Sequence, residues 1–583
     1  MIRYCVLRGR SAKWGLSLAV VLAVAVLVLA QAPKTIDIAN SDQNVTVFGE
    51  DSKLIGGFGD HLGIAVAATG DFNGDGIMDL LIGANNADGP KNKRDGAGEA
   101  YVVFGEPGLP AQIDVAGAVG RRKPDVRIFG EEIGVMSALL GWGLGDTLGE
   151  VVTTGDLNDD GFDDLIITAS LADGPGNSRP DTGEVYIIFG KSEDDWDRMR
   201  PSPSDPVIFD VKGVAGPKPD VIIFGADEAD VLGSALSTGD VDGDGIDDLL
   251  MGACYADGPG NRRTDAGEAY VFWGKPTASW SSTIDLRTTP ADVIFYGADA
   301  GDNLGSAIAS AVASRNRMNI RGDVNGDGLD DILIGARNAD GAGNRKLDVG
   351  EVYVLFGRTA TSWSALTPVD LSITNADVTI YGVDAGDNLS SFLGLSMGDV
   401  NGDTIDDLLI GAPRAAGPGN GRPNSGEAYV LFGRLAWTPT IDLSGLTTLT
   451  DVTIYGADSY DGLGSSIASG DVNHDGIDDI LVGAPIGSGP GNVRYYGAGE
   501  AYLIYGHTFP AGTTLDLAWP GTAQVTIYGA EGGSPGDNLG YAISSGDVNG
   551  DQVEDILVGA WGADGPMNAR QDAGEAYVIF GSP

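Results

Sequence analysis

A nine-residue acidic loop that recurs seven times constrains this chain more than any other feature. Its clearest copy is Asp240-Val-Asp-Gly-Asp-Gly-Ile-Asp-Asp248, which leads directly into an apolar run ending at Ala253. Carboxylates stand at positions one, three, five and nine, and Gly245 at position six permits a sharp bend. Oxygen ligands at alternate positions around a glycine turn suit a hard cation such as Ca²⁺, with the carbonyl of Ile246 as a further ligand.

The same pattern gives seven candidate calcium sites with five ligands each. The loops span residues 71–79, 156–164, 240–248, 323–331, 399–407, 471–479 and 547–555. The side chains at positions one, three, five and nine and the carbonyl at position seven are the candidate ligands. They are Asp71, Asn73, Asp75, Ile77 and Asp79; Asp156, Asn158, Asp160, Phe162 and Asp164; Asp240, Asp242, Asp244, Ile246 and Asp248; Asp323, Asn325, Asp327, Leu329 and Asp331; Asp399, Asn401, Asp403, Ile405 and Asp407; Asp471, Asn473, Asp475, Ile477 and Asp479; and Asp547, Asn549, Asp551, Val553 and Asp555.

An EF-hand does not explain these loops, because that motif needs a bidentate Glu at its twelfth position and a helix on each side. Successive loops begin 72 to 85 residues apart, so the 583-residue chain is one array of repeats. Two loops depart from the pattern at position six, where Thr404 and Gln552 replace glycine. We expect these two to bind calcium less tightly.

The charge of the chain limits its partners. There are 83 acidic residues against 35 basic ones, and the formal net charge is −48. Nucleic acids and anionic membranes both attract Lys and Arg, so neither is an expected partner. Crowded acidic loops repel one another without a cation, which predicts that calcium is structural. The expected partner is a protein or glycan at a cell surface or in a matrix.

Residues 1–32 are typical of an export signal. A basic segment containing Arg8 and Lys13 precedes an apolar run at 16–30, and Ala30 and Ala32 offer small residues for cleavage. An uncleaved signal anchor is the alternative. In either case we expect the body of the chain, 33–583, to be secreted or at the cell surface, with no membrane insertion after cleavage. Cys254 then has no partner, and no disulfide is expected.

Each repeat predicts four short strands and no helix. In the first repeat a β-branched and aromatic segment at 45–49 ends in glycine, a small apolar segment precedes the loop, Leu80 to Ala84 follows it, and 99–105 closes the repeat. Seven such repeats are typical of an all-β, seven-bladed β-propeller with four-stranded antiparallel blades. Because the chain starts with a strand that fits the fourth position of a blade and stops after a third, the N-terminal strand is expected to close the ring.

The repeats resemble the FG-GAP repeats of the integrin alpha-subunit β-propeller. The resemblance rests on the glycines after Phe or Tyr, such as Gly225 and Gly456, on the acidic loops, on the Ile-Gly-Ala-Pro at 410–413 and on the closing Ala-Tyr-Val strands. It covers 33–583. It implies a propeller that binds calcium and serves adhesion or recognition.

Three other features stand out from the repeats. A turn between the second and third strands keeps an Asn, an Arg and a Glu, as in Asn492, Arg494 and Glu500. It predicts an Arg-carboxylate clamp between neighbouring blades, or else a repeated contact surface. An apolar insertion at 131–146 could bind a partner or plug the channel. A basic insertion at 314–321 creates Arg-Gly-Asp at 321–323, where Asp323 is also a candidate calcium ligand.

The sequence contains few residues in patterns typical of an enzyme active site. The three histidines, His61, His474 and His507, lie in different repeats and match no zinc or Ser-His-Asp arrangement. We expect a non-catalytic scaffold. The alternatives are a secreted polysaccharide hydrolase or lyase with paired carboxylates in the central channel, and a calcium-dependent lectin.

Overall fold

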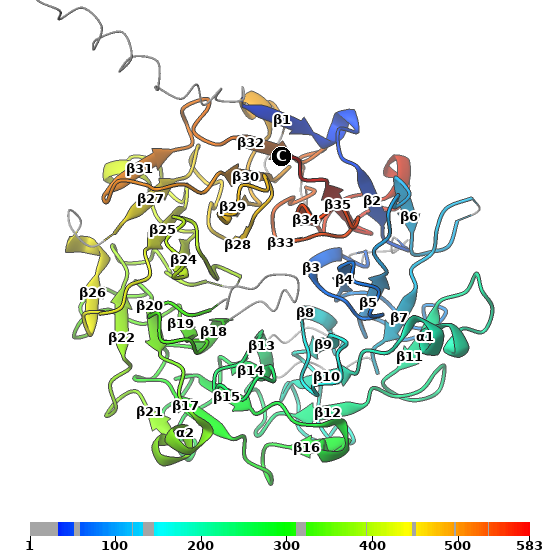
Figure 1. Cartoon of the computed structure of the whole chain (residues 1–583), viewed down its shortest axis with the longest axis horizontal. Coiled ribbons are helices and arrows are strands. Elements are labelled where there is room, and N and C mark those ends of the chain that lie inside the picture. Colours follow the sequence, from blue (N-terminus) through cyan, green and yellow to red (C-terminus); the bar gives the residue numbers. More distant parts are fainter. Residues whose placement is uncertain are drawn as a thin grey trace, which may run out of the picture.

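Seven sheets of five strands each stand around a central axis in the computed structural model (Figure 1). The structure describes residues 33–583 except 52–58, 119, 132–144, 311–321, 392, 446–449, 495–496 and 534–535. The predicted signal at 1–32, most of the apolar insertion at 131–146 and the basic insertion at 314–321 therefore lie outside the described residues. The seven-bladed propeller predicted from the repeats is confirmed.

The three inner strands of each blade are antiparallel and come from one repeat. We number the blades 1 to 7 in chain order. The innermost strands are β3 (Leu62–Gly70), β8 (Leu148–Gly155), β13 (Leu232–Gly239), β18 (Leu304–Ala309), β23 (Leu395–Gly398), β28 (Ser466–Gly470) and β33 (Ile543–Gly546). The second strands are β4 (Asp79–Ala84), β9 (Asp164–Ala169), β14 (Asp248–Ala253), β19 (Ile332–Ala336), β24 (Asp407–Ala412), β29 (Asp479–Ala484) and β34 (Asp555–Ala560). The third strands are β5 (Glu99–Val103), β10 (Glu184–Ile188), β15 (Glu268–Phe272), β20 (Glu351–Leu355), β25 (Glu427–Leu431), β30 (Glu500–Ile504) and β35 (Glu575–Ile579).

The outer half of each blade contains one strand more than predicted. The fourth strands are β7 (Val126–Phe129), β12 (Val221–Phe224), β17 (Val293–Tyr296), β22 (Val378–Tyr381), β27 (Val452–Tyr455), β32 (Val525–Tyr528) and β2 (Val45–Phe48). The fifth strands are β11 (Val207–Asp210), β16 (Thr283–Asp285), β21 (Val369–Asp370), β26 (Thr440–Asp442), β31 (Thr513–Asp516), β1 (Lys34–Asp37) and β6 (Gln112–Asp114).

The fifth strand corrects the prediction of four-stranded antiparallel blades. It is parallel to the fourth strand, as in the pairing of Val207 with Val126 and Asp210 with Phe129. It belongs to the following repeat: the chain leaves the third strand of one blade, covers the outer edge of the preceding blade, and returns as the fourth strand. The short strand thereby pairs backbone groups that the fourth strand would otherwise expose at the rim.

The N-terminal strands close the ring, as predicted. β2 pairs antiparallel with β35, so the strand at 45–48 completes blade 7. β1 pairs in parallel with β32 and becomes the fifth strand of blade 6. Figure 1 shows these blue strands beside the orange and red strands of the last two blades. The two ends of the described chain are thus joined through two blades.

The core lies between neighbouring blades. β4 and its equivalents are buried on both faces, as their unbroken apolar sequences predict. One cluster, for example, joins Ile166 and Val185 of blade 2 to Leu249 and Met251 of blade 3. Each blade therefore buries its faces against the next, so neighbouring repeats stabilise one another.

Two short helices, which the sequence did not predict, lie on the rim between third and fifth strands. They are α1 (Glu193–Met199) and α2 (Ala360–Leu366). Short 3₁₀ turns occur at η1 (Ile38–Asn40), η2 (Thr277–Ser279), η3 (Pro418–Asn420), η4 (Leu443–Gly445), η5 (Pro490–Asn492) and η6 (Pro566–Asn568). Within the described residues, no helix is long and apolar enough to cross a bilayer.

Candidate metal centres

The seven acidic loops all connect the innermost strand of a blade to its second strand, so they lie together at one end of the ring. Two positions of each loop need a left-handed backbone. In the loop at 240–248 these are Gly243 (φ 77°) and Gly245 (φ 92°). Glycine adopts this region without a steric penalty, and the two bends turn the intervening carboxylates toward one point.

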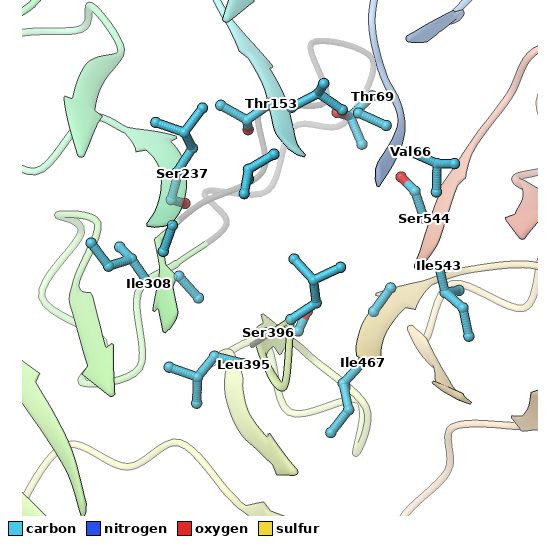
Figure 2. A pocket seen from close by; sticks show the side chains of 18 of the residues that line it. Val66, Thr69, Thr153, Ser237, Ile308, Leu395, Ser396, Ile467, Ile543 and Ser544 are labelled. Atoms are coloured by element: carbon cyan, nitrogen blue, oxygen red, sulfur yellow. The ribbon is translucent and has the colours of Figure 1, made fainter. Parts of the chain in front are cut away.

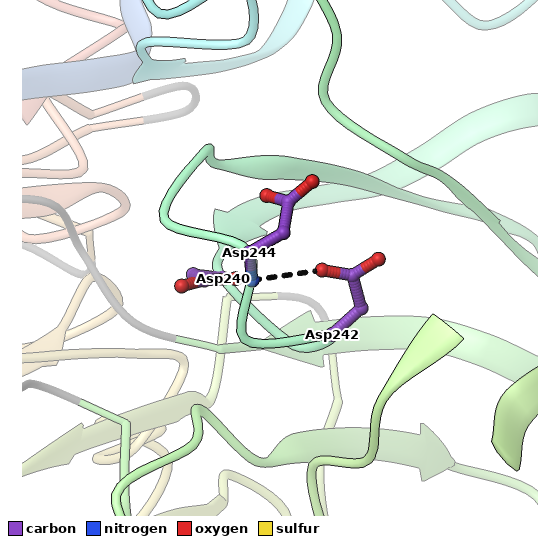
Figure 3. Close-up of side chains that lie close together, drawn as sticks. All are labelled: Asp240, Asp242 and Asp244. Carbon is purple, nitrogen blue, oxygen red and sulfur yellow. Dashed lines mark hydrogen bonds between the residues drawn. The ribbon is translucent and has the colours of Figure 1, made fainter. Parts of the chain in front are cut away.

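Three carboxylates converge in the loop of blade 3. Ligand oxygens of Asp240, Asp242 and Asp244 all lie within 4.8 Å of one another. Figure 3 shows the three side chains around the bend, with the N–H of Asp244 donating to Asp242 Oδ1 at 3.1 Å. The carboxylate of Asp240 also accepts hydrogen bonds from Gly243 (2.8 Å) and Gly245 (2.9 Å). The fold thus brings together the first, third and fifth predicted ligands.

The ninth-position carboxylate lies at the buried base of the loop. Asp248 has no exposed surface, and it accepts hydrogen bonds from the N–H groups of Val241 (3.0 Å), Gly274 (2.9 Å) and Asp242 (3.3 Å). An ionised carboxylate has about four acceptor positions, so these three bonds leave about one position for a cation. Bonds equivalent to those from Val241 and Gly274 recur in the other six loops. Position nine therefore ties each loop to the end of its third strand.

The electrostatics of the loops favour a bound cation. Burial, together with the neighbouring Asp240 and Asp242, raises the pKa of Asp248 to about 9. Burial and the charge of Asp244 raise the pKa of Asp242 to about 6. A divalent cation would offset both the desolvation and the repulsion that oppose ionisation of these groups.

An orphaned amide oxygen supports the same conclusion in blade 2. Asn158 Oδ1, at the third position of its loop, is buried without a hydrogen-bond partner. The amide nitrogen of the same side chain donates to Asp164 at 3.3 Å, which directs the oxygen away from that carboxylate. A buried acceptor without a donor suits a metal ligand. The residues present thus fit a hard divalent cation held by oxygen atoms.

The hydrogen bonds to the first-position carboxylate recur in the remaining loops with small differences. At 323–331, Asp323 accepts from Gly326 and Gly328, as Asp240 does from its own loop. At position six, Thr404 and Gln552 adopt φ angles of 73° and 70°, where the other loops have glycine. Non-glycine residues are strained there, which is the physical basis for expecting weaker sites. Of the Arg-Gly-Asp tripeptide, Arg321 lies outside the described residues.

Four tryptophans that the sequence analysis did not use cap these loops. Each indole N–H donates to the carbonyl of the second loop residue of the preceding blade. The pairs are Trp196 with Phe72 (2.9 Å), Trp280 with Leu157 (3.3 Å), Trp363 with Val241 (3.1 Å) and Trp437 with Val324 (3.0 Å). Three of the four stand six residues after the glycine that closes the third strand, a recurrence visible in the sequence.

At the opposite end of the ring, Arg-carboxylate clamps are present, but they do not join neighbouring blades as predicted. Each joins the turn between second and third strands to the Asp that ends the fifth strand of the same blade. The pairs are Arg94–Asp210 (2.7 Å), Arg179–Asp285 (3.0 Å), Arg263–Asp370 (3.0 Å), Arg422–Asp516 (2.8 Å), Arg494–Asp37 (2.5 Å) and Arg570–Asp114 (2.9 Å).

Blade 4 differs from that prediction at one residue. Lys346, and not the expected Arg345, lies near Asp442, at 4.0 Å. Since the fifth strand comes from the following repeat, each clamp fastens one repeat to the blade before it. A direct bond between blades comes from the Asn of the same turn, as where Asn261 Nδ2 donates to Asp227 at 3.1 Å.

The Glu that recurs at the end of this turn forms a buried pair with a Tyr two residues later. In blade 6, the hydroxyl of Tyr502 donates to Glu500. The same pair occurs in every blade. Burial raises the pKa of Glu500 to about 7. The Glu residues therefore have a structural partner and face no open site.

Within the described residues, the central channel is lined by the innermost strands. The part of its wall drawn in Figure 2 carries apolar side chains such as Val66 and Ile467, together with Ser and Thr hydroxyls such as that of Ser237. Among the residues that line this cavity none is Asp, Glu or His. A neighbouring cavity is lined by one carboxylate, that of Glu150, and by His61. Neither described lining contains the paired carboxylates that hydrolysis of a glycosidic bond would require.

Comparison with known proteins places the repeats in a family. The FG-GAP repeat model matches residues 62–103, 148–188, 232–272, 322–355, 393–431, 463–504 and 539–579, one match for each blade. Six of the matches begin at or near an innermost strand, and the match at 322–355 begins directly before its acidic loop. All seven end with a third strand, so each includes one acidic loop.

Two kinds of curated relative are similar to the chain. Integrin alpha-PS2 of Drosophila melanogaster is 32% identical over 200 residues, which are 34% of this chain and 12% of that protein. Integrin alpha-5 of Xenopus laevis is 31% identical over 195 residues, 31% of this chain and 16% of that protein. Phosphatidylinositol-glycan-specific phospholipase D of Homo sapiens is 27% identical over 425 residues, 71% of this chain and 43% of that protein. The chain thus matches less than half the length of each relative.

Proposed function

Since the chain is an FG-GAP repeat protein with an integrin-alpha-like seven-bladed propeller, we propose that it is a calcium-stabilised scaffold for adhesion or recognition. The observation that carries the calcium proposal is the convergence of Asp240, Asp242 and Asp244 in a loop pattern that occurs in all seven blades. Calcium would supply a positive charge that several oxygens share, linking the two strands of each connection.

The chain's own residues prepare the loops for that ion. Backbone N–H groups hold the carboxylate of Asp240 in the bend, and Asp248 anchors the base of the loop to the end of the third strand. These bonds order part of each loop before the ion binds. Such a site stabilises the folded state because the unfolded chain does not assemble it.

Recognition rather than catalysis fits the described channel. One part of its wall is apolar and hydroxyl-bearing, and the neighbouring cavity holds a single carboxylate, that of Glu150. The buried Glu residues of the turns are engaged by Tyr hydroxyls. We therefore propose that the propeller is not itself an enzyme. An enzymatic role for a longer protein is the second candidate, because some relatives are named phospholipase D. The matched region is 43% of the human protein.

The apolar and basic segment at 1–32 supports export, and we propose that 33–583 acts outside the cytoplasm. The net charge of −48 supports a protein or glycan partner over nucleic acid.

A binding screen against glycans and cell surfaces, run with calcium and with EDTA, tests the recognition proposal. Binding that appears only with calcium is the expected result. Suppose that the purified protein hydrolyses a glycosylphosphatidylinositol or polysaccharide substrate, and that substitutions in the acidic loops do not abolish this activity. That result would contradict the recognition proposal. A protein that binds nothing and cleaves nothing would also count against recognition, leaving calcium as a structural ion alone.

A further inference from the structure

At six of the junctions between neighbouring acidic loops, the same backbone hydrogen bond joins one loop to the next. The N–H of the eighth residue in one loop donates to the carbonyl of the first residue in the loop of the preceding blade. The pairs are Asp163 with Asp71 (3.2 Å), Asp247 with Asp156 (3.3 Å), Asp330 with Asp240 (3.3 Å), Asp406 with Asp323 (3.1 Å), Asp478 with Asp399 (3.0 Å) and Met78 with Asp547 (3.0 Å).

The side chain of the eighth residue makes a second bond in the reverse direction. At three junctions its carboxylate accepts from the N–H of the first residue in the preceding loop. The pairs are Asp163 with Asp71 (2.8 Å), Asp247 with Asp156 (2.9 Å) and Asp330 with Asp240 (2.8 Å). At the fourth junction Asp406 accepts from Gly322, one residue earlier. One residue thus fixes both backbone groups of the first ligand residue in the neighbouring blade.

Apolar contacts interlock the same loops. The side chain at position seven of one loop covers the fourth residue of the loop before it. A Cβ on Gly402 would lie 2.9 Å from Ile477 Cδ1, and a Cβ on Gly550 would lie 2.9 Å from Ile77 Cδ1. At these two junctions the side chain at position seven therefore packs directly against the backbone of the neighbouring loop.

We infer that the eighth residue of a loop is a positioning residue for the calcium site of the preceding blade, which couples calcium binding at neighbouring loops. This inference rests on the calcium proposal above. The eighth residue stands between two candidate ligands of its own loop, the carbonyl of residue seven and the carboxylate of residue nine. An ion bound there fixes the backbone on both sides of it.

The coupling follows from shared ordering. Asp247, fixed in this way, holds the N–H and carbonyl of Asp156, whose carboxylate is the first ligand of the next site. The second ion then binds a loop that is already partly ordered, and by linkage each ion favours the other. The coupling runs from blade to blade through the six junctions that carry this bond.

One junction provides a natural exception. Met78 occupies the eighth position of the first loop, so the junction with the loop at 547–555 keeps the backbone bond to Asp547 but has no side-chain acceptor. This junction lies where blades 7 and 1 meet, at the closure of the ring. Coupling there is weaker, and Met78 offers a matched control.

Counting bound calcium by native mass spectrometry, with affinities from calorimetric titration, tests the inference. Asp247→Ala leaves all five candidate ligands at 240–248 intact but removes the acceptor for Asp156. We expect calcium affinity at 156–164 to fall by about tenfold or more, the scale of a lost charge-assisted hydrogen bond. At the free calcium concentration that just saturates the wild type, the variant should hold one ion fewer.

Two further variants serve as controls for this result. Asp247→Asn should restore the count, because its amide oxygen accepts the same hydrogen bond. Met78→Ala should leave the count and the affinities unchanged, because no acceptor is lost at that junction.

A double variant locates the lost ion. Asp160→Ala removes a ligand of the loop at 156–164, so adding Asp247→Ala to it should cost no further calcium. If Asp247→Ala keeps the wild-type count and affinities while lowering the melting temperature, the eighth residue is only structural and the coupling is wrong. A wild-type protein that takes up no calcium would overturn both the coupling and the calcium proposal.

Discussion

At the scale of single residues, the backbone at position six separates five loops from two. Gly245 has a φ of 92°, and a Cβ there would meet no atom within 4 Å, so the position is demanding only in its backbone. Thr404 adopts the same left-handed region with a β-branched side chain. The left-handed conformation costs a residue other than glycine about 1–2 kcal/mol.

We predict that Thr404→Gly stabilises the protein and tightens the calcium site at 399–407. The gain is the relieved strain less the larger entropy of the unfolded chain, a net of roughly 0.5–1 kcal/mol. Denaturant unfolding in saturating calcium measures it. Gly245→Thr, which introduces the same strain into open space, should lower stability by a similar amount. Equal stabilities for the wild type and both variants would refute the argument.

The buried Glu–Tyr pairs predict a pH dependence. The pKa of Glu500 rises from 4.5 to about 7, so between these values the folded protein holds a proton that the unfolded chain has released. The free energy of unfolding contributed by this group is complete below pH 4.5 and is lost as pH rises through about 7.

Glu500→Gln isolates that contribution, because the amide cannot ionise and its oxygen still accepts from Tyr502. At saturating calcium, the wild type should lose up to about 3 kcal/mol more than the variant between pH 5 and pH 8. Glu500 stands at the opposite end of β30 from the calcium loop, which keeps metal binding out of the comparison. Parallel pH profiles for the two proteins would show that the buried acid is not the cause.

At the scale of elements, the fifth strand and its clamp hold the ring together at the rim. Arg494 reaches from blade 6 to Asp37 on β1, the first described strand of the chain, and also donates to the carbonyl of Gly529. Both side chains of the ion pair are less than a fifth exposed. Removing the Arg would leave a largely buried carboxylate without its partner.

Arg494→Ala should therefore destabilise the protein by about 1.5–3 kcal/mol, the scale of hydrogen bonds to charged groups. Thermal or denaturant unfolding measures this. Lys346→Ala is the matched control, because Lys346 is more exposed and lies 4.0 Å from Asp442, and it should cost less. A loss of partner binding at unchanged stability would instead favour the contact-surface interpretation of these turns.

The elements also show what a sequence of this kind can and cannot predict. The seven loops, the buried second strands and the closure by the strand at 45–48 follow from period, apolar pattern and the order of segments, and all were predicted. The fifth strand was not predicted, because the short segments that form it, such as Ile284-Asp-Leu286, are too short to be recognised as strands and pair only with another repeat. The Trp196 cap and the clamp role of Lys346 depend on contacts between repeats, which no single repeat reveals.

At the scale of the whole molecule, charge and architecture depend on each other. Seven acidic loops meet at one end of the ring, and their neighbours are bonded through residues such as Asp163 and Asp330. Without cations the carboxylates of this end would repel one another within a chain of net charge −48. We propose that calcium at these loops stabilises the propeller.

Thermal unfolding of the purified protein during a calcium titration, followed by tryptophan fluorescence, tests that claim most directly. Trp196, Trp280 and Trp363 bond directly to loop carbonyls, so their emission should change as calcium binds. We expect EDTA to lower the melting temperature, added calcium but not magnesium to restore it, and the emission change to have the same midpoint. A melting temperature and an emission spectrum unchanged by EDTA or calcium would show that calcium does not stabilise the propeller.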